Sequence, residues 1–308
     1  MTGSSRGVKV LLGTSTFGEF DNSPLERLRQ AGFEIIENPY KRRLKREEVI
    51  ELLSNNVSGL IAGLEPLDRE ILEKSNLKVI SRCGSGLSNI DLEAAKELGI
   101  KVLSTPHGPT SAVAELTLGA LLSLLRMIPL MDQDLHAGKW NKRIGTQLEG
   151  KTVVIIGFGN IGRRLAELLA PFKTRILIVD PFLKDYKEDL PVFTLEEALP
   201  QADIVTLHSS GETIILAGKE FNLIKPGAFL LNAARGGLID EGALIKSLKE
   251  GKIKGAWIDA FNNEPYSGPL IKFKQVILTP HAGSYTLECR FSMEMASVEN
   301  LINAFINE

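Results

Sequence analysis

A glycine pattern near the middle of the chain restricts the possible folds more than any other feature. The apolar run Thr152–Ile156 is followed at once by Gly157, Gly159 and Gly162, in the order Gly-x-Gly-x-x-Gly. Where such a pattern joins a strand to a helix, the glycines allow a tight turn, a close approach to a pyrophosphate and close packing of the helix on the strand. We therefore predict a strand–turn–helix unit that binds a dinucleotide.

An acidic residue at the end of the next apolar run indicates which dinucleotide binds. The run 175–179 is followed by Asp180, near the spacing of roughly 20 residues at which an acid binds the ribose. Its carboxylate accepts hydrogen bonds from ribose hydroxyls and repels a 2'-phosphate, and Pro181 rather than an arginine comes next. The amides of Asn160 and Ile161 would face the phosphates. The pattern predicts NAD as the cofactor; an exposed aspartate in an ordinary turn is the alternative.

Short apolar runs alternate with helical segments along the whole chain. Such alternation is typical of parallel sheets with helices packed on their faces. A chain of 308 residues is also long enough for roughly two domains. We therefore predict an α/β protein of two Rossmann-like or flavodoxin-like parallel-sheet domains with a cleft between them. The strands expected are 8–12, 34–37, 59–62, 78–81, 101–103, 152–156, 175–179, 204–207, 228–232, 255–258 and 276–278.

Charge and composition exclude several classes of partner. A formal net charge of −2 gives no reason to expect nucleic acid or an acidic membrane. The basic run 41–46 is followed at once by Glu47 and Glu48, which indicates a solvated helix face. The apolar stretch 116–131 contains Arg126 and is shorter than the ~20 residues of a membrane span. We expect neither a nucleic-acid nor a membrane partner.

The cysteines and histidines indicate the cellular compartment and whether a metal site is expected. The two cysteines, Cys83 and Cys289, do not form a disulfide framework and fit a reducing compartment. The N-terminus lacks the apolar segment of a signal peptide, so we expect a cytoplasmic protein. His107, His136 and His208 have no metal-ligand spacing with one another, and no metal site is predicted.

Three residues far apart in the sequence suit the oxidation of a 2-hydroxy acid. Arg235, Glu264 and His281 each follow an apolar run, within a phrase rich in glycine or proline. A guanidinium can hold a carboxylate in bidentate form, and an imidazole, with an intrinsic pKa of about 6.5, can exchange the hydroxyl proton. A glutamate can orient that imidazole and stabilise its charged form.

Each of these residues also has an ordinary interpretation. Taken singly, Arg235 suits a structural ion pair, Glu264 suits a turn cap, and His281 suits a bond to a backbone carbonyl. All three follow strands, however, and the carboxyl ends of parallel strands are where such sheets bind ligands. Together they predict a catalytic site.

Several phrases resemble the signatures of the NAD-dependent D-2-hydroxyacid dehydrogenase family. They cover most of the chain from about residue 59 onward, in the family's order. The segment 105–117, together with 138–140, is most similar to the D-3-phosphoglycerate dehydrogenase branch. The phrases are 82–91, 157–162, 232–241, 259–265 and 279–281.

The resemblance implies roles for individual residues. Arg235, Glu264 and His281 would be the catalytic residues. The substrate would contact the turn after residue 81 together with the catalytic arginine, through Arg82, Gly84, Ser85, Gly86 and Arg235. NAD would contact Ser85, Gly157, Gly159, Asn160, Ile161, Gly162, Asp180, His208, Ser209, Ala233, Ala234, Asp259 and Gly283.

The resemblance also implies the domain organisation. A discontinuous substrate-binding domain would comprise residues 1–104 and 284–308, and residues 105–283 would form the NAD-binding domain. The long apolar helix after Pro106 commonly forms a dimer interface in this family, so we expect a homodimer; packing within the monomer is the alternative. Because the chain stops at Glu308, we expect the short form without a regulatory domain.

The sequence is compatible with more than one substrate. Arg82 matches a position near the phosphate of phosphoglycerate, but Ala62, Gly63 and Leu64 stand where a second arginine is often found. A phosphate with one cation fewer binds more weakly. Three interpretations are therefore compatible with the sequence. The substrate is D-3-phosphoglycerate, or it is a small 2-keto acid such as glyoxylate or hydroxypyruvate. In the third interpretation, the protein is an NAD-sensing binding protein like the corepressors that share this fold.

Overall fold

The computed structural model describes residues 7–183, 190–211 and 213–306. Its contacts divide the chain into two compact units: unit 1 is Met1–Pro109 with Tyr285–Glu308, and unit 2 is Thr110–Ser284. The boundaries expected from sequence fall after residues 104 and 283, and those of the structure fall after Pro109 and Ser284.

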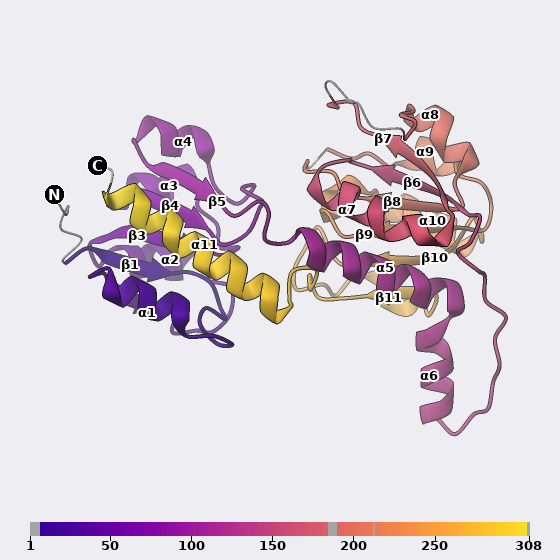
Figure 1. Ribbon diagram of the computed structural model, residues 1–308, viewed down its shortest axis with the longest axis horizontal. Helices are drawn as coiled ribbons and strands as arrows, with labels where there is room; N and C mark the ends of the chain where they lie inside the picture. The colour runs from indigo at the N-terminus through magenta and orange to yellow at the C-terminus, as the bar shows by residue number, and fades with distance from the viewer. Residues whose placement is uncertain (1–6, 184–189, 212, 307–308) are drawn as a thin grey trace. The chain divides into compact units, whose positions relative to one another are not determined.

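Unit 1 is a five-stranded parallel sheet with helices on both faces (Figure 1). The strand order is β2-β1-β3-β4-β5. Helices α1 and α11 pack together on one face, while α2, α3 and α4 form an apolar core on the other. The strands are β1 (Lys9–Leu12), β2 (Glu34–Glu37), β3 (Val57–Ala62), β4 (Val79–Arg82) and β5 (Lys101–Ser104). The helices are α1 (Ser23–Gln30), α2 (Arg46–Leu53), α3 (Arg69–Glu73), α4 (Leu92–Glu97) and α11 (Leu287–Ile306).

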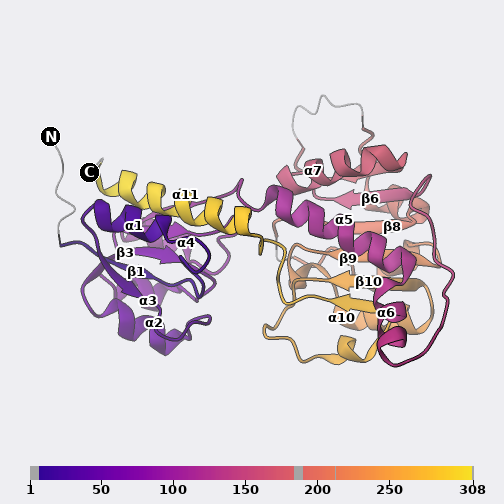
Figure 2. The same cartoon turned by 60° about the horizontal axis from the view of Figure 1, so that its bottom comes forward.

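Unit 2 is a six-stranded parallel sheet in the order β11-β10-β9-β8-β6-β7. Helices α5 and α7 cover one face of the sheet (Figure 2). Helices α8, α9 and α10 cover the other face. Short 3-10 helices at 170–172, 199–201, 236–238 and 269–272 complete the connections. The strands are β6 (Thr152–Ile156), β7 (Arg175–Val179), β8 (Ile204–Leu207), β9 (Ala228–Asn232), β10 (Ile253–Ile258) and β11 (Val276–Leu278). The helices are α5 (Thr110–Arg126), α6 (Ile128–His136), α7 (Asn160–Leu169), α8 (Leu195–Ala198), α9 (Gly218–Leu223) and α10 (Glu241–Lys249).

The prediction of two parallel-sheet α/β domains is confirmed. Each strand of unit 2 is nearly continuous in apolar residues because helices bury both of its faces. The core on the α5 side contains Trp257, which is fully buried, and the core on the other side contains Phe221.

The long apolar segment after Pro106 forms two helices rather than one. Helix α5 ends at Arg126, and Met127 adopts a left-handed conformation with φ of 53°. Among the described residues, no single helix is long and apolar enough to cross a membrane; α5 and α6 pass that test only as a pair, bent by 65°. Helix α5 buries much of its length against α7, whereas α6 has no buried residues.

Candidate active site

The register of the unit 2 sheet brings all of its strand ends to one edge. The final residues of the six strands pair in a single row: Val179, Ile156, Leu207, Asn232, Ile258 and Leu278. Because the strands are parallel, the segments that follow them start from the same edge. These segments contain every site residue predicted from the sequence within unit 2.

The glycine turn after β6 is built for close backbone approach. Gly157 has φ of 90°, and a Cβ atom there would lie 2.6 Å from the backbone nitrogen of Ser209. A Cβ atom on Gly162 would lie 2.3 Å from the carbonyl oxygen of Gly157. Neither position has room for a side chain, so the turn stays tight against the start of α7. That helix has no side-chain cap at Gly159, which leaves the positive end of its dipole for an anion.

Asp180 is tied to the glycine turn. One carboxylate oxygen accepts a hydrogen bond from the Phe158 amide at 2.8 Å, and the other accepts one from Phe182 at 2.9 Å. These bonds hold the carboxylate at the end of β7, beside the turn that follows β6. The arrangement is the one required for an acid that contacts a ribose whose phosphates lie on the turn.

His208 lies at the point where the strand order reverses. Strand β6 has β7 on one side and β8 on the other, so the crevice outside β6 and β8 is the expected ligand site of this sheet. Burial lowers the pKa of His208 to about 4, so its imidazole is neutral at neutral pH. Its Nε2 lies 2.9 Å from the hydroxyl of Thr206. Among the described residues nothing hydrogen-bonds to its Nδ1.

The structure brings His281 and Glu264 together. The Nδ1 atom of His281 lies 3.0 Å and 3.1 Å from the two carboxylate oxygens of Glu264. The Phe261 amide donates to the same carboxylate at 3.1 Å, which fixes its position. With Nδ1 directed at a carboxylate, Nε2 is the ring nitrogen that can exchange a proton with a ligand.

Asp259 holds the turn that carries His281. Its carboxylate is 1% exposed and accepts hydrogen bonds from the Thr279 hydroxyl and from the amides of Ala282 and Gly283. Its carbonyl also accepts the His281 amide at 2.9 Å. His281 itself has φ of 52°, a conformation that non-glycine residues keep only when neighbours impose it. The sequence indicated only a cofactor contact for Asp259; this positioning role depends on contacts that no local pattern reveals.

Arg235 lies on a turn that packs against the Glu264 loop. A Cβ atom on Gly236 would lie 2.1 Å from the carbonyl carbon of Phe261 and 2.2 Å from the amide nitrogen of Asn262. The two backbones therefore touch, and only glycine fits at the contact. The side chain of Asn232 donates to the Arg235 carbonyl at 2.9 Å, which holds the turn at the end of β9.

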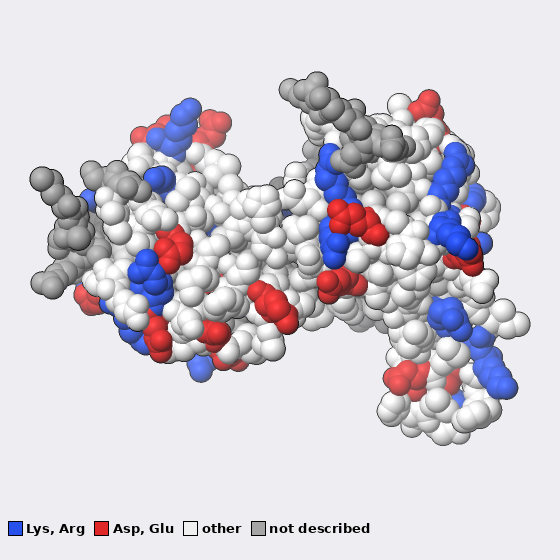
Figure 3. All heavy atoms as spheres, in the orientation of Figure 1, with Lys and Arg blue, Asp and Glu red and all other residues white. Residues whose placement is uncertain are grey.

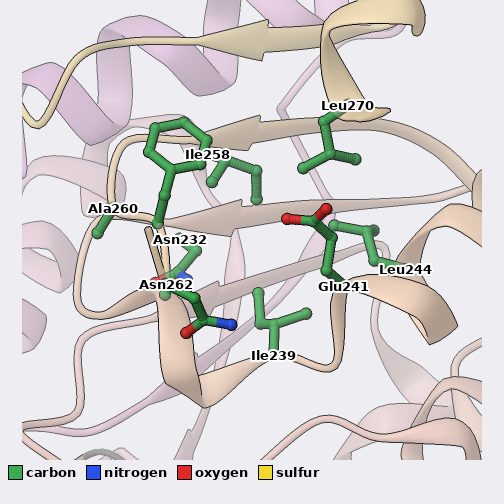
Figure 4. Close-up of a pocket in the computed structure, with 10 residues that line it drawn as sticks. Asn232, Ile239, Glu241, Leu244, Ile258, Ala260, Asn262 and Leu270 are labelled. Carbon is green, nitrogen blue, oxygen red and sulfur yellow. The ribbon is translucent and has the colours of Figure 1, made fainter. Parts of the chain in front are cut away.

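A small cavity lies behind these two loops (Figure 4). Its volume of about 20 Å³ suffices for one water molecule but is far below the 300–1,000 Å³, in round numbers, of a ligand pocket. The ring of Tyr266 stacks on Phe261, with 4.3 Å between ring centres, and its hydroxyl donates to Glu241 at 3.0 Å. This cavity is packing behind the site, and Tyr266 is a support for the Glu264 loop that the sequence analysis missed.

The remaining predicted residues are also placed. Ala233 and Ala234 follow β9 and Gly283 follows His281 in unit 2, whereas Ser85 lies in unit 1. Of the predicted substrate residues there, Arg82 is the last residue of β4, and Gly84, Ser85 and Gly86 follow in the segment after it. The Gly84 amide, at φ of 145°, donates to the Thr105 hydroxyl at 2.8 Å. The described residues contain no group of three or more His, Cys, Asp or Glu side chains that could hold a metal ion.

Comparison with known proteins adds independent information. Residues 118–283 match the family of D-isomer specific 2-hydroxyacid dehydrogenases, NAD-binding domain. D-3-phosphoglycerate dehydrogenase of Archaeoglobus fulgidus is 34% identical over 290 residues, which are 91% of this chain and 54% of that protein. Glyoxylate reductase of Thermococcus litoralis is 38% identical over 255 residues, 77% of each chain.

Solved structures agree with these sequence matches. The TT0316 protein from Thermus thermophilus has a TM-score of 0.87 and 32% identity, with 96% of each chain covered. The chain spans about half the length of the phosphoglycerate dehydrogenases that it matches.

Proposed function

Because the chain belongs to the D-isomer specific 2-hydroxyacid dehydrogenase family, we propose that it is an NAD-dependent oxidoreductase. It transfers a hydride between the nicotinamide and C2 of a D-2-hydroxy acid or the corresponding 2-keto acid. The observation that carries this proposal is the pairing of His281 Nδ1 with the Glu264 carboxylate, at the sheet edge that also contains the glycine turn.

The residues of unit 2 fit NAD. The tight turn at Gly157 and Gly162 lies against the start of α7, where no side chain caps the helix, and Asp180 lies beside the turn. When bound, NAD supplies the hydride acceptor or donor. We propose contacts also from Asn160, Ile161, His208, Ser209, Ala233, Ala234, Asp259 and Gly283, and from Ser85 of unit 1.

His281 would move the proton. During oxidation its Nε2 takes the proton of the C2 hydroxyl, and during reduction it returns that proton to the carbonyl oxygen. Glu264 holds the ring through Nδ1 and stabilises the positive charge that forms. Arg235 would bind the substrate carboxylate through a bidentate pair of hydrogen bonds, and the amides of Ser85 and Gly86 would bind it as well.

The names of two relatives indicate two candidate substrates for this activity. One is D-3-phosphoglycerate, the substrate that the name of the Archaeoglobus relative carries; the other is a small 2-keto acid such as glyoxylate, as in the Thermococcus relative. NADH oxidation measured with glyoxylate, hydroxypyruvate and 3-phosphohydroxypyruvate tests the proposal. Turnover of at least one acid is expected. Tight NADH binding with no turnover of any would instead favour an NAD-sensing protein.

Asp180 is expected to set the preference for NADH over NADPH. Replacing Asp180 with asparagine keeps the side-chain shape and removes the charge that repels a 2'-phosphate. The ratio of kcat/KM for NADH to that for NADPH should fall about tenfold, equivalent to about 1.4 kcal/mol. Steady-state kinetics with both cofactors measures it. An unchanged ratio would mean that another residue discriminates between them.

We infer that the protein forms a homodimer through α6 and the segment that follows it. None of the α6 residues is buried, and Trp140 and Ile144 in the next segment are 80% and 93% exposed. Apolar side chains exposed together on one projecting segment are typical of an association surface. A second copy of the chain would cover them.

A charge placed on this segment should separate the protomers. Ile144→Asp is expected to convert the dimer to a monomer in sedimentation velocity. Ile271→Asp, at a position that is 60% exposed on the 3-10 helix 269–272, is the matched control and should remain dimeric. A wild-type monomer, or an Ile144→Asp dimer, would contradict the proposal.

We propose that the protein is cytoplasmic and that it binds neither nucleic acid nor a membrane. On the face shown in Figure 3, acidic and basic side chains are interspersed rather than segregated. Two of the five basic residues in the run 41–46 form ion pairs: Arg42 binds Glu48, and Arg46 binds Asp68 and Glu70. Cys83 and Cys289 are both free thiols, which supports a reducing compartment.

A further inference from the structure

The strand order of unit 1 also reverses at one point. Strand β1 has β2 on one side and β3 on the other, and ligands of open parallel sheets bind outside the carboxyl ends of the strands at such a point. The residues there are Gly13 and Thr14 after β1, and Gly63 to Glu65 after β3. The chemistry of these few residues therefore decides what this edge of unit 1 accepts.

A buried carboxylate lies at this point of the sheet edge. Glu65 is 1% exposed, and both of its carboxylate oxygens accept the Gly63 amide, at 2.9 Å and 3.0 Å. A Cβ atom on Gly13 would lie 2.1 Å from one of these oxygens, and one on Gly63 would lie 2.8 Å from the other. The carboxylate thus lies between Gly13 and Gly63, and a larger residue at either position would collide with it.

The nearby cation is already used within unit 1. Arg82 is 7% exposed, and its Nη1 donates to the carbonyl oxygens of Ala62 and Cys83. Burial raises the pKa of Glu65, and the Gly63 amide and the charges of Arg82 and Arg43 oppose that rise. Because Nη1 is directed at two carbonyl oxygens and a carboxylate lies nearby, Arg82 offers a phosphate neither its full set of donors nor its full charge.

The same point of the sheet edge offers a neutral hydrogen-bonding group. The Thr14 hydroxyl oxygen is buried and has no hydrogen-bond partner among the described residues, and Thr14 is only 7% exposed. Buried hydroxyls are normally satisfied, so this one is suited to a ligand group that can donate and accept. A hydroxyl fits that requirement beside a carboxyl group in either protonation state, whereas a phosphate dianion and the Glu65 carboxylate each disfavour the charge of the other.

We propose that Glu65 determines substrate specificity: it makes the site select D-2-hydroxy and 2-keto acids with a short uncharged tail and reject their phosphorylated counterparts. This inference rests on the dehydrogenase function proposed above. Arg82 serves to hold the turn after β4 and to balance Glu65, and Thr14 contacts the hydroxyl of a hydroxymethyl tail.

The test compares two acids that differ only in a phosphate. With NADH as reductant, wild-type kcat/KM for hydroxypyruvate should exceed that for 3-phosphohydroxypyruvate by at least about tenfold, the size of the effect of one unfavourable charge contact worth about 1.4 kcal/mol. Glu65→Gln keeps the shape and removes the charge, so it should shift the ratio toward the phosphorylated acid by about tenfold. Glu93→Gln, on the exposed surface of α4, changes the net charge equally and should leave the ratio unchanged.

A second comparison tests the hydroxyl contact. Thr14→Val removes a hydroxyl at nearly constant volume and should lower kcat/KM for hydroxypyruvate about two- to tenfold relative to glyoxylate, which has no hydroxymethyl group. Wild-type preference for the phosphorylated acid, or an unchanged ratio in Glu65→Gln, would overturn the inference alone. Absence of turnover with every 2-keto acid would overturn the dehydrogenase function, and the inference with it.

Discussion

Replacing His281 with alanine is expected to lower kcat by about 10²- to 10⁴-fold, the usual contribution of a positioned acid–base group. The imidazole is oriented by a carboxylate, through the 3.0 Å contact of its Nδ1 with Glu264. NADH affinity should change little, because the glycine turn and Asp180 are tied to each other and not to His281. Steady-state kinetics and fluorescence titration of NADH measure the two quantities separately.

Glu264→Gln provides the graded comparison for this experiment. Glutamine keeps the size of the side chain and can still accept from the Phe261 amide, but it removes the negative charge beside the imidazole. The loss in kcat should therefore be smaller than in His281→Ala. Full turnover in His281→Ala would refute its role as the acid–base group. Loss of NADH binding in that variant would show that the residue supports the cofactor site instead.

Asp259→Asn is expected to lower both stability and turnover. The carboxylate of Asp259 accepts from one hydroxyl and two amides, and an asparagine amide group would direct its own donors at one of these groups. An unsatisfied buried donor costs about 1–3 kcal/mol, so the free energy of unfolding should fall by about that amount. Because the same bonds fix the turn of His281, kcat should fall as well, by more than the folded fraction accounts for.

Asp240→Asn is the matched control for that change. Asp240 caps α10 in the same unit, where its side chain accepts the Ala243 amide at 3.0 Å. Asparagine and aspartate serve about equally as helix N-caps, so stability and kcat should stay close to wild type. Urea unfolding and kinetics on the three proteins provide the comparison. A destabilised Asp259→Asn with wild-type kcat would refute the positioning role and leave only a packing role.

Much of the fold could be predicted, and a candidate site proposed, because both depend on short sequence segments. The turn from Gly157 to Gly162 depends on a strand and a helix that adjoin it in the sequence, so residue spacing is sufficient evidence. Arg235, Glu264 and His281 each follow an apolar run, and parallel strands carry such residues to one edge. The register of the unit 2 sheet, with all six strand ends in one row, is the reason that the segments containing these three residues start from the same edge.

The break at Met127 and the support of the Glu264 loop could not be predicted in the same way. The apolar stretch 116–131 reads as continuous because hydrophobicity does not encode the left-handed residue that ends α5. The stacking of Tyr266 on Phe261 and the contact of Gly236 with Asn262 join loops from different strands. Such contacts arise only when the sheet has placed those strands side by side.

For this chain, then, local spacing was enough to predict two α/β units, a dinucleotide turn and the side chains that we propose to react. Tertiary packing decided which of the other polar residues are buried and what they hold: Asp259 on the turn of His281, and Glu65 between Gly13 and Gly63. The physical reason is that burial and hydrogen-bond partners depend on residues brought together from distant strands. A carboxylate in a short loop looks the same in sequence whether water or two glycines surround it.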